Sequence, residues 1–593
     1  MKKYSSEKNV QYLIAFLKKF NIRKVVASPG TTNLSFVASL QSDDFFDIYS
    51  CVDERSAAYM AVGIAEENKE PVVITCTGAT ASRNYLSALT EAFYRKLPIL
   101  VVTGTKNENR IGHLDNQLID RRSSPNDVII HREYISSIKD EEDEKFCKLK
   151  LNIALTELFR NGGGPVHINL QTVYSRDFSI QSLPDVNIIR RYSYSNSDSF
   201  PEIPKGRIAV FIGSHNTFSP DLTFSIDKFC ASNNAVVFCD HTSGYYGSYK
   251  YIHALVGSQK YSSHPEIANI DLCIHIGEVS AEYAALGGLN LKQVWRVSED
   301  GEIRDTFNRL TCVFEITEKD FFDYYSKESL KNEKEYLELC EAAYDSIYEC
   351  IPELPLSNVW VAQQLHDRLP AGSSLHLGIL NSLRSWNLFK ISNGVNTFSN
   401  VGGFGIDGCM SSMIGASFAN PRKLFFGVFG DLSFFYDMNS IGNRHIGNNV
   451  RILLINNGRG QEFRNFYHTG YLFGEDADKY IAAAGHFGNK SRSLVKHFSE
   501  DLGYEYLSAD SKSDFLQKYE HFISPVELEK PVVFEVFTNT DDENQALLMM
   551  WSIEKQQKDF IIGKIIDAAG GKEVVSNVLG KKNIAFFKKL LGK

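Results

Sequence analysis

The chain has 593 residues, 43% of them hydrophobic and 23% charged, and a formal net charge of −9. It is too long for one hydrophobic core, and we expect about three domains. The acidic balance, without a basic surface interleaved with aromatic residues, argues against nucleic-acid binding, and no apolar run is long enough to span a membrane. Ten cysteines without any Cys-x-x-Cys pair are typical of reduced thiols, which predicts a cytoplasmic protein.

Strand and helix patterns alternate through the first domain, which we place at 1–185. The N-terminal segment lacks a continuous apolar stretch and a cleavage site, so it is interpreted as an amphipathic helix. Apolar strands that run into glycine turns or helices are predicted at 23–33, 46–67, 71–95 and 97–110, with a last strand at 164–171. This repetition predicts a doubly wound parallel sheet.

Two more domains follow the polar, turn-rich segment near 192–206. The central domain, 195–345, repeats the strand and helix pattern without a Gly-x-Gly-x-x-Gly fingerprint, so neither FAD nor NAD is assigned to it. The third domain is placed at 355–545. The predicted fold class is therefore α/β with three doubly wound parallel-sheet domains. The lysine-rich tail, 546–593, is expected to form amphipathic helices.

The most informative stretch is 427–463, where an apolar strand, a helix and a second apolar strand follow one another. This order predicts a parallel βαβ unit, with Asp431 and Asn457 side by side at the carboxyl edge of the sheet. A carboxylate and an amide oxygen suit a hard divalent cation that takes further ligands from water and phosphate. The backbone carbonyl of Arg459, in the turn that follows, is a further candidate ligand.

A second motif lies far upstream at Asp53-Glu54-Arg55-Ser56-Ala57. It ends a predicted strand and opens an Ala- and Gly-rich helix, so Glu54 is expected at or near a helix N-terminus. One reading is a carboxylate that caps the helix and interacts with its dipole. The other is a functional carboxyl group.

Together these motifs resemble the thiamine-diphosphate-dependent decarboxylase and carboligase family, which carries pyrimidine-binding, central and diphosphate-binding domains in this order. The resemblance implies thiamine diphosphate and Mg²⁺ as cofactors and at least a homodimer, either a dimer or a tetramer, with active sites between subunits. It implies that Glu54 contacts the cofactor's pyrimidine ring, that Gln117 lies near the reacting carbon, and that Asp431, Asn457 and the Arg459 carbonyl bind the metal. The cofactor-binding residues implied by the resemblance are Ser28, Pro29, Gly30, Glu54, Thr77, Gly78, Ser382, Gly405, Ile406, Gly430, Asp431, Leu432, Ser433, Asn457, Gln461 and Phe463.

Within that family the motifs are most similar to the menaquinone-pathway synthases, the 2-succinyl-5-enolpyruvyl-6-hydroxy-3-cyclohexene-1-carboxylate synthases. Three arginines that bind substrate carboxylates in those enzymes are replaced here, by Thr32, Trp386 and Val401, although Arg384 is close enough in sequence to substitute for one. Lys106 keeps a positive charge. Glu462 and Arg459 add charge after Asn457. We therefore place Thr32, Lys106, Trp386, Val401 and Glu462 in the substrate pocket.

The function predicted from this comparison is decarboxylation of a short, pyruvate-like 2-oxo acid and transfer of its acyl carbanion to an unknown acceptor. Trp386 and Val401 would make the donor end small and apolar, which favours a short donor. The alternatives are a simple 2-oxo acid decarboxylase, the menaquinone-pathway synthase with altered anchoring residues, and a catalytically silent scaffold. The presence of Glu54, Asp431 and Asn457 argues against the scaffold.

Overall fold

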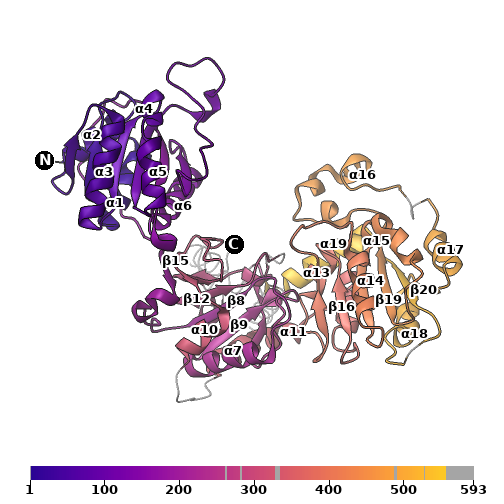
Figure 1. The fold of residues 1–593 in the computed structure, drawn as a ribbon. Helices are drawn as coiled ribbons and strands as arrows, with labels where there is room; N and C mark the ends of the chain where they lie inside the picture. Colours follow the sequence, from indigo (N-terminus) through magenta and orange to yellow (C-terminus); the bar gives the residue numbers. More distant parts are fainter. Residues whose placement is uncertain are drawn as a thin grey trace, which may run out of the picture. The chain divides into compact units, whose positions relative to one another are not determined.

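The computed structural model describes residues 2–260, 264–280, 284–326, 334–486, 490–526 and 528–555. Three large sheets, in which the paired strands described below run parallel, are flanked by helices (Figure 1), so the predicted α/β fold class is confirmed. The first sheet belongs to a compact unit that includes Met1–Phe200, and the other two belong to a unit that includes Pro201–Glu299 and the chain from Ile316. Among the described residues, no helix combines the length and the apolar character that a membrane span needs.

The first sheet has the strand order β2-β1-β3-β4-β6-β5, and all of its strands are parallel. Its strands are β1 (Lys24–Ala27), β2 (Asp47–Ser50), β3 (Val72–Thr77), β4 (Ile99–Thr105), β5 (His131–Ile135) and β6 (Val166–Gln171). Its helices are α1 (Lys8–Lys19), α2 (Leu34–Gln41), α3 (Glu54–Asn68), α4 (Thr80–Arg83), α5 (Leu86–Tyr94) and α6 (Glu141–Glu157).

Alternate residues of these strands pack into two separate cores. Val25 and Val73 belong to the core that includes α1, α2 and α6, whereas Val26 and Ile74 belong to the core that includes α3 and α5. Since successive side chains of a strand point to opposite faces, both faces of the sheet are covered, which is the arrangement of a doubly wound domain.

The second sheet contains five consecutive parallel strands in the order β10-β9-β8-β12-β14. These strands are β8 (Ile208–Ile212), β9 (Ala235–Cys239), β10 (Lys250–Ile252), β12 (Leu272–Ile276) and β14 (Val294–Val297). The accompanying helices are α7 (Pro220–Asn233), α8 (Ala254–Gly257), α9 (Pro265–Ala268), α10 (Glu318–Tyr325) and α11 (Glu335–Tyr348). Two short parallel pairs are formed by β7 (Arg190–Ser193) with β15 (Leu310–Glu315) and by β11 (Asn269–Ile270) with β13 (Asn290–Leu291).

The third sheet has the order β17-β16-β18-β19-β21-β20, with all of its strands parallel. Its strands are β16 (Ser374–Leu377), β17 (Asn396–Phe398), β18 (Phe425–Gly430), β19 (Val450–Asn456), β20 (Glu505–Ala509) and β21 (Val532–Phe537). Its helices are α12 (Asn358–Leu365), α13 (Asn381–Trp386), α14 (Cys409–Ala419), α15 (Asp431–Asp437), α16 (Ala477–Tyr480), α17 (Leu494–Asp501), α18 (Lys512–Phe522) and α19 (Thr540–Trp551). Residues 556–593, most of the predicted basic tail, lie outside the described residues.

Candidate active site

The predicted βαβ unit is present, and it brings Asp431 and Asn457 to one edge of the third sheet. Strands β18 and β19 pair in parallel, with Gly430 opposite Ile455, and Asp431 and Asn457 directly follow them. Asp431 is 4% exposed. Burial raises the pKa of its carboxyl group to about 7, although backbone N–H groups of Leu432 and Gly458 partly offset this effect.

The second candidate metal ligand at this edge is the side-chain oxygen of Asn457. The Oδ1 atom of Asn457 is buried without a hydrogen bond to any described residue. A buried amide oxygen without a partner is costly, and so is a buried carboxylate, but a hard divalent cation would satisfy both. The donor set of Asp431 and Asn457 therefore fits Mg²⁺.

The turn after Asn457 is held in place by a buried network. Asn456 donates from Nδ2 to Oε1 of Glu535 at 2.7 Å, and its own Oδ1 accepts from the Gly458 N–H at 3.1 Å. Gly458 has a positive φ of 79°, which glycine adopts without strain. Glu535 is 1% exposed and was not predicted, although a lone carboxylate in the apolar strand β21 was a visible signal.

The side chain of Arg459 is held in an ion pair on the side of the turn after Asn457. Its Nη1 pairs with Oδ2 of Asp478 at 2.7 Å, and Arg464 pairs with the other oxygen of the same carboxylate. Leu432 packs against Gly460, where an added Cβ would lie 3.2 Å from Leu432 Cδ1.

Other residues predicted to bind the cofactor connect the loops around α15. Ser433 donates from Oγ to the carbonyl oxygen of Ile406 at 2.7 Å, which ties the loop before α14 to α15. Gly405 precedes Ile406, and an added Cβ there would lie 2.4 Å from Asp407 Oδ1. Gln461 is 5% exposed and accepts from Thr540 Oγ1 at 3.1 Å.

Ser382 and Gly430, both predicted to bind the cofactor, differ in their surroundings. Ser382 is 3% exposed and accepts a hydrogen bond from Asn358 Nδ2 at 3.3 Å. At Gly430 an added Cβ would meet nothing within 4 Å, so packing alone does not demand a glycine there.

The second unit contains a cavity of about 670 Å³. Apolar side chains from several elements line it, among them Leu380, Phe404, Phe463, Leu547 and Trp551. Polar and charged side chains also line it, including Lys260, Arg384, Glu462 and Tyr467. A largely apolar cavity with a few converging polar groups is typical of small-molecule sites.

Two charged side chains of this cavity, those of Arg384 and Glu462, form an ion pair. Arg384 donates from Nη1 to Oε1 of Glu462 at 2.5 Å, and the Tyr467 hydroxyl donates to Oε2 of Glu462 at 3.1 Å. The side chains of Arg384 and Glu462 are 15% and 14% exposed. Glu462, which the sequence places in the substrate pocket, thus lines this cavity.

Trp386 and Val401, both predicted in the substrate pocket, do not line this cavity. Trp386 is fully buried, with 0% exposed, and does not line the cavity. Two residues along a helix differ by about 200° around its axis, so Arg384 rather than Trp386 faces the cavity from α13. Val401 lines a different cavity, of about 540 Å³, together with Ser214 and His215.

Glu54 is the first residue of α3, as the sequence predicts, but it does not cap the helix. The cap is Asp53, whose Oδ1 accepts from the Ser56 N–H at 2.8 Å. Glu54 is half-buried, and its Oε2 accepts from Asn84 Nδ2 at 3.2 Å. The capping role therefore belongs to the neighbouring residue, and the Glu54 carboxyl group is available for another role.

The remaining motifs of the first domain meet at the carboxyl ends of β1 and β3. The hydroxyl oxygens of Thr32 and Thr77 are 2.5 Å apart, and the Gly78 N–H donates to Thr32 Oγ1 at 3.3 Å. At Gly30 an added Cβ would lie 2.9 Å from the Cβ of Thr77. The preceding residues differ in exposure, since Ser28 is buried and Pro29 is exposed.

Lys106 and Gln117 belong to one loop structure. Lys106 donates from Nζ to the carbonyl oxygen of Asn116 at 3.0 Å and to its Oδ1 at 2.6 Å. Gln117 follows directly, is exposed, and has a positive φ of 58°. Lys106 thus holds the loop that presents Gln117.

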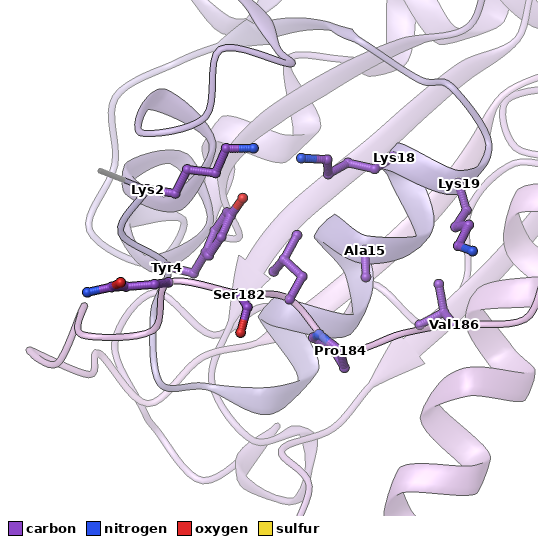
Figure 2. A pocket seen from close by; sticks show the side chains of 10 residues that line it. Lys2, Tyr4, Ala15, Lys18, Lys19, Ser182, Pro184 and Val186 are labelled. Carbon is purple, nitrogen blue, oxygen red and sulfur yellow. The ribbon is translucent and has the colours of Figure 1, made fainter.

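A pocket near the N-terminus has a structural explanation instead. Figure 2 shows the side chains of Lys2, Tyr4 and Lys18 at this pocket. All three contact the buried Asp43, with Lys2 Nζ at 2.8 Å, Lys18 Nζ at 2.5 Å and the Tyr4 hydroxyl at 2.6 Å. Their polar groups stabilise the packing of the N-terminal segment, so we assign no chemistry to this pocket.

Comparison with known proteins identifies relatives along almost the whole chain. Residues 8–124 match the family model described as "Thiamine pyrophosphate enzyme, N-terminal TPP binding domain". The chain is 29% identical over 572 residues to a Bacteroides thetaiotaomicron protein named 2-succinyl-5-enolpyruvyl-6-hydroxy-3-cyclohexene-1-carboxylate synthase, which covers 92% of this chain and 98% of that one. A Bacteroides fragilis protein of the same name is 29% identical with the same coverage, and one from Flavobacterium psychrophilum is 26% identical, covering 91% of this chain and 97% of that one.

A solved structure, the Rhodococcus jostii RHA1 thiamine diphosphate-dependent 4-hydroxybenzoylformate decarboxylase, is 14% identical. The similarity covers 90% of this chain and 100% of that one, with a TM-score of 0.36.

Proposed function

We propose that this chain, a thiamine pyrophosphate enzyme of the decarboxylase and synthase group by its N-terminal domain and its relatives, uses thiamine diphosphate and Mg²⁺ to decarboxylate a short 2-oxo acid. The resulting acyl carbanion is transferred to an acceptor. One observation carries the proposal: the buried Asp431 carboxyl group and the unpartnered Asn457 Oδ1 follow adjacent parallel strands. This pair of oxygens is suited to a Mg²⁺ ion that also binds a diphosphate.

In this proposal thiamine diphosphate, when bound, supplies a nucleophilic carbon and accepts the electrons that decarboxylation releases. Asp431 and Asn457 hold the Mg²⁺. The carboxyl group of Glu54 would contact the cofactor's pyrimidine ring, a role that its position apart from the helix cap supports. The apolar walls of the 670 Å³ cavity exclude water from the reacting atoms.

The residues that line the cavity support a short 2-oxo acid as the donor. Arg384 is the cationic group on α13, and Glu462 balances its charge within the cavity. A second carboxylate on the donor would compete with Glu462 for this guanidinium, whereas a methyl group or another small apolar group would pack against Leu380 or Phe463. A pyruvate-like acid therefore suits the cavity better than a dicarboxylate.

Measurement of CO₂ release tests the reaction. The purified protein with Mg²⁺ and thiamine diphosphate is incubated with pyruvate or with 2-oxoglutarate, each with and without an added aldehyde acceptor. The proposal predicts faster release from pyruvate and a carbon–carbon bonded product when the acceptor is present. Free aldehyde as the sole product would indicate a simple decarboxylase, and no release from any 2-oxo acid would contradict the proposal.

A second candidate function comes from the relatives. Proteins at 29% identity over nearly the full chain are named as 2-succinyl-5-enolpyruvyl-6-hydroxy-3-cyclohexene-1-carboxylate synthases. This candidate requires Arg384 to leave Glu462 and bind a substrate carboxylate. Incubation with 2-oxoglutarate and isochorismate distinguishes the two functions, because the synthase consumes both substrates and the proposed enzyme does not.

The proposal includes a homo-oligomer of at least two chains. Its support is the relationship to thiamine pyrophosphate enzymes. Light scattering of the protein with its cofactors gives the assembly mass, and a monomer that is fully active would contradict this part of the proposal.

A further inference from the structure

Arg121 is a buried arginine in the first domain, and the proposed function assigns it no role. It is 8% exposed, and its Nε donates to Oδ1 of Asn169 on β6 at 3.0 Å. Its guanidinium also lies against the turn after β3, because a Cβ added to Gly78 would lie 2.2 Å from Nη1 and 2.7 Å from Nη2. Glycine at this position therefore makes room for the guanidinium.

The Nη1 atom of Arg121 is buried and has no hydrogen-bond partner among the described residues. Arg122, the next residue, is exposed and forms a two-pronged pair with Asp120 at 3.0 and 2.7 Å. An arginine fork is normally buried only with hydrogen-bonded anionic partners, since an uncompensated buried charge costs several kcal/mol. This environment is typical of an arginine that binds an anion.

The charged groups around Arg121 favour the binding of an anion at its guanidinium. Burial and the nearby guanidinium groups of Arg83 and Arg132 together lower the pKa of Arg121 to about 10, against the opposing influence of Cys76 and Glu108. Glu108 is itself partly buried, which raises its pKa. A further carboxylate placed against the fork would relieve this excess of positive charge.

The position is one at which parallel α/β sheets bind ligands. In the order β2-β1-β3-β4, the chain turns to one side after β1 and to the other with β3, so the crevice between their carboxyl ends is a topological switch point. Thr32 follows β1, Thr77 ends β3 and Gly78 follows it; the Thr32 and Thr77 hydroxyls are in contact, and Arg121 lies against Gly78. Polar groups and a cation therefore converge at the carboxyl ends of β1 and β3.

We propose that Arg121 binds a carboxylate of a substrate, one other than the carboxylate lost as CO₂. The inference rests on the proposed function for the identity of the ligand as an organic acid. It makes Arg121 a determinant of specificity that selects an anionic substrate through its planar fork. Because the proposed pyruvate-like donor carries only the carboxylate that is lost, the carboxylate bound by Arg121 belongs to the acceptor.

Calorimetric titration of the protein loaded with Mg²⁺ and thiamine diphosphate tests this. The probes are pyruvate, 2-oxoglutarate and benzoate, and the proteins are the wild type, Arg121→Gln, Arg121→Lys and the matched control Arg122→Gln. We expect Arg121→Gln to weaken binding of a carboxylate probe about 10- to 100-fold, Arg121→Lys to weaken it less, and Arg122→Gln to leave it unchanged. Loss with benzoate supports the assignment to the acceptor, and loss confined to 2-oxoglutarate would contradict it.

Equal binding of every acid to the wild type and to Arg121→Gln would overturn the inference, and so would the absence of binding to the wild type. Binding of inorganic phosphate without binding of the acids would also contradict it. Arg121→Lys keeps the test valid if Arg121→Gln does not fold, because it retains the charge and loses the fork. Cofactor binding is measured separately, so a failure of the proposed function shows as no uptake of thiamine diphosphate by the wild type.

Discussion

Arg384 Nη1 lies 2.5 Å from Glu462 Oε1, and this ion pair spans the cavity lining from α13 to the turn after β19. Glu462→Gln removes the negative charge and retains the shape. We expect the free energy of unfolding to fall by about 1–3 kcal/mol, because a largely buried cation loses its counterion. We also expect the KM for 2-oxoglutarate relative to that for pyruvate to fall about tenfold, because the released guanidinium attracts a second carboxylate. Urea unfolding and CO₂ release measure the two effects.

The exposed pair of Lys319 and Asp323 serves as the control, with side chains 50% and 42% exposed. Lys319→Gln should change stability by less than about 0.5 kcal/mol and leave both KM values unchanged. An unchanged KM ratio in Glu462→Gln would show that the pair does not set donor preference.

Glu54 and its neighbour Asp53 separate a chemical role from a structural one. Glu54→Gln should slow hydrogen–deuterium exchange at the reactive carbon of bound thiamine diphosphate by about 10²- to 10⁴-fold, because the carboxyl group that would contact the pyrimidine ring is lost. Nuclear magnetic resonance after acid quench measures this exchange. Asp53→Ala, which removes the cap to Ser56, should cost about 1 kcal/mol of stability without changing the exchange rate. Wild-type exchange in Glu54→Gln would contradict the assignment.

Glu543 gives the protein a pH-dependent stability. It accepts from Thr538 Oγ1 at 2.7 Å and from the Asn358 N–H at 3.1 Å, and burial raises its pKa from 4.5 to about 7. The folded state therefore keeps this proton at pH values at which the unfolded chain has lost it. The stability that the protonated group supports is complete below about pH 4.5 and is lost as the pH rises through about 7.

Glu543→Gln should remove this pH dependence. Relative to the wild type, its free energy of unfolding should rise by about 1–3 kcal/mol between about pH 5 and about pH 8. Urea unfolding across that range measures the difference. The exposed neighbour provides the control, since Asp541→Asn should shift stability by less than about 0.5 kcal/mol at each pH. A constant difference between Glu543→Gln and the wild type would contradict the prediction.

The sequence predicted the α/β fold and the Asp431–Asn457 edge because both depend on strong local patterns. Strand β18 is a continuous apolar run and β19 contains the run from Ile452 to Ile455, and each strand is followed by a polar residue at the sheet edge. In a parallel sheet such runs leave little choice of pairing. The Glu54 position followed in the same way from a strand that ends where an Ala-rich helix starts.

The parts of the site that the sequence does not show depend on the direction of single side chains. The family resemblance placed Trp386 in the substrate pocket, whereas in the structure α13 buries Trp386 and directs Arg384 to the cavity. Arg121 stands in a polar segment beside Arg122 and looks like a surface residue in the sequence. Its burial depends on Gly78, which has no side chain to occupy the space of the guanidinium, and on Asn169, which is 48 residues away in the chain.

The most direct test of the central claim is calorimetric titration of Mg²⁺ and thiamine diphosphate into the wild type, Asp431→Asn, Asn457→Ala and the control Asp476→Asn, whose carboxylate forms an exposed pair with Lys479. The account predicts that the wild type and the control bind the pair of cofactors and that both site variants bind at least about 100-fold more weakly, because each loses a metal ligand. Equal binding by all four proteins, or no binding by the wild type, would contradict it.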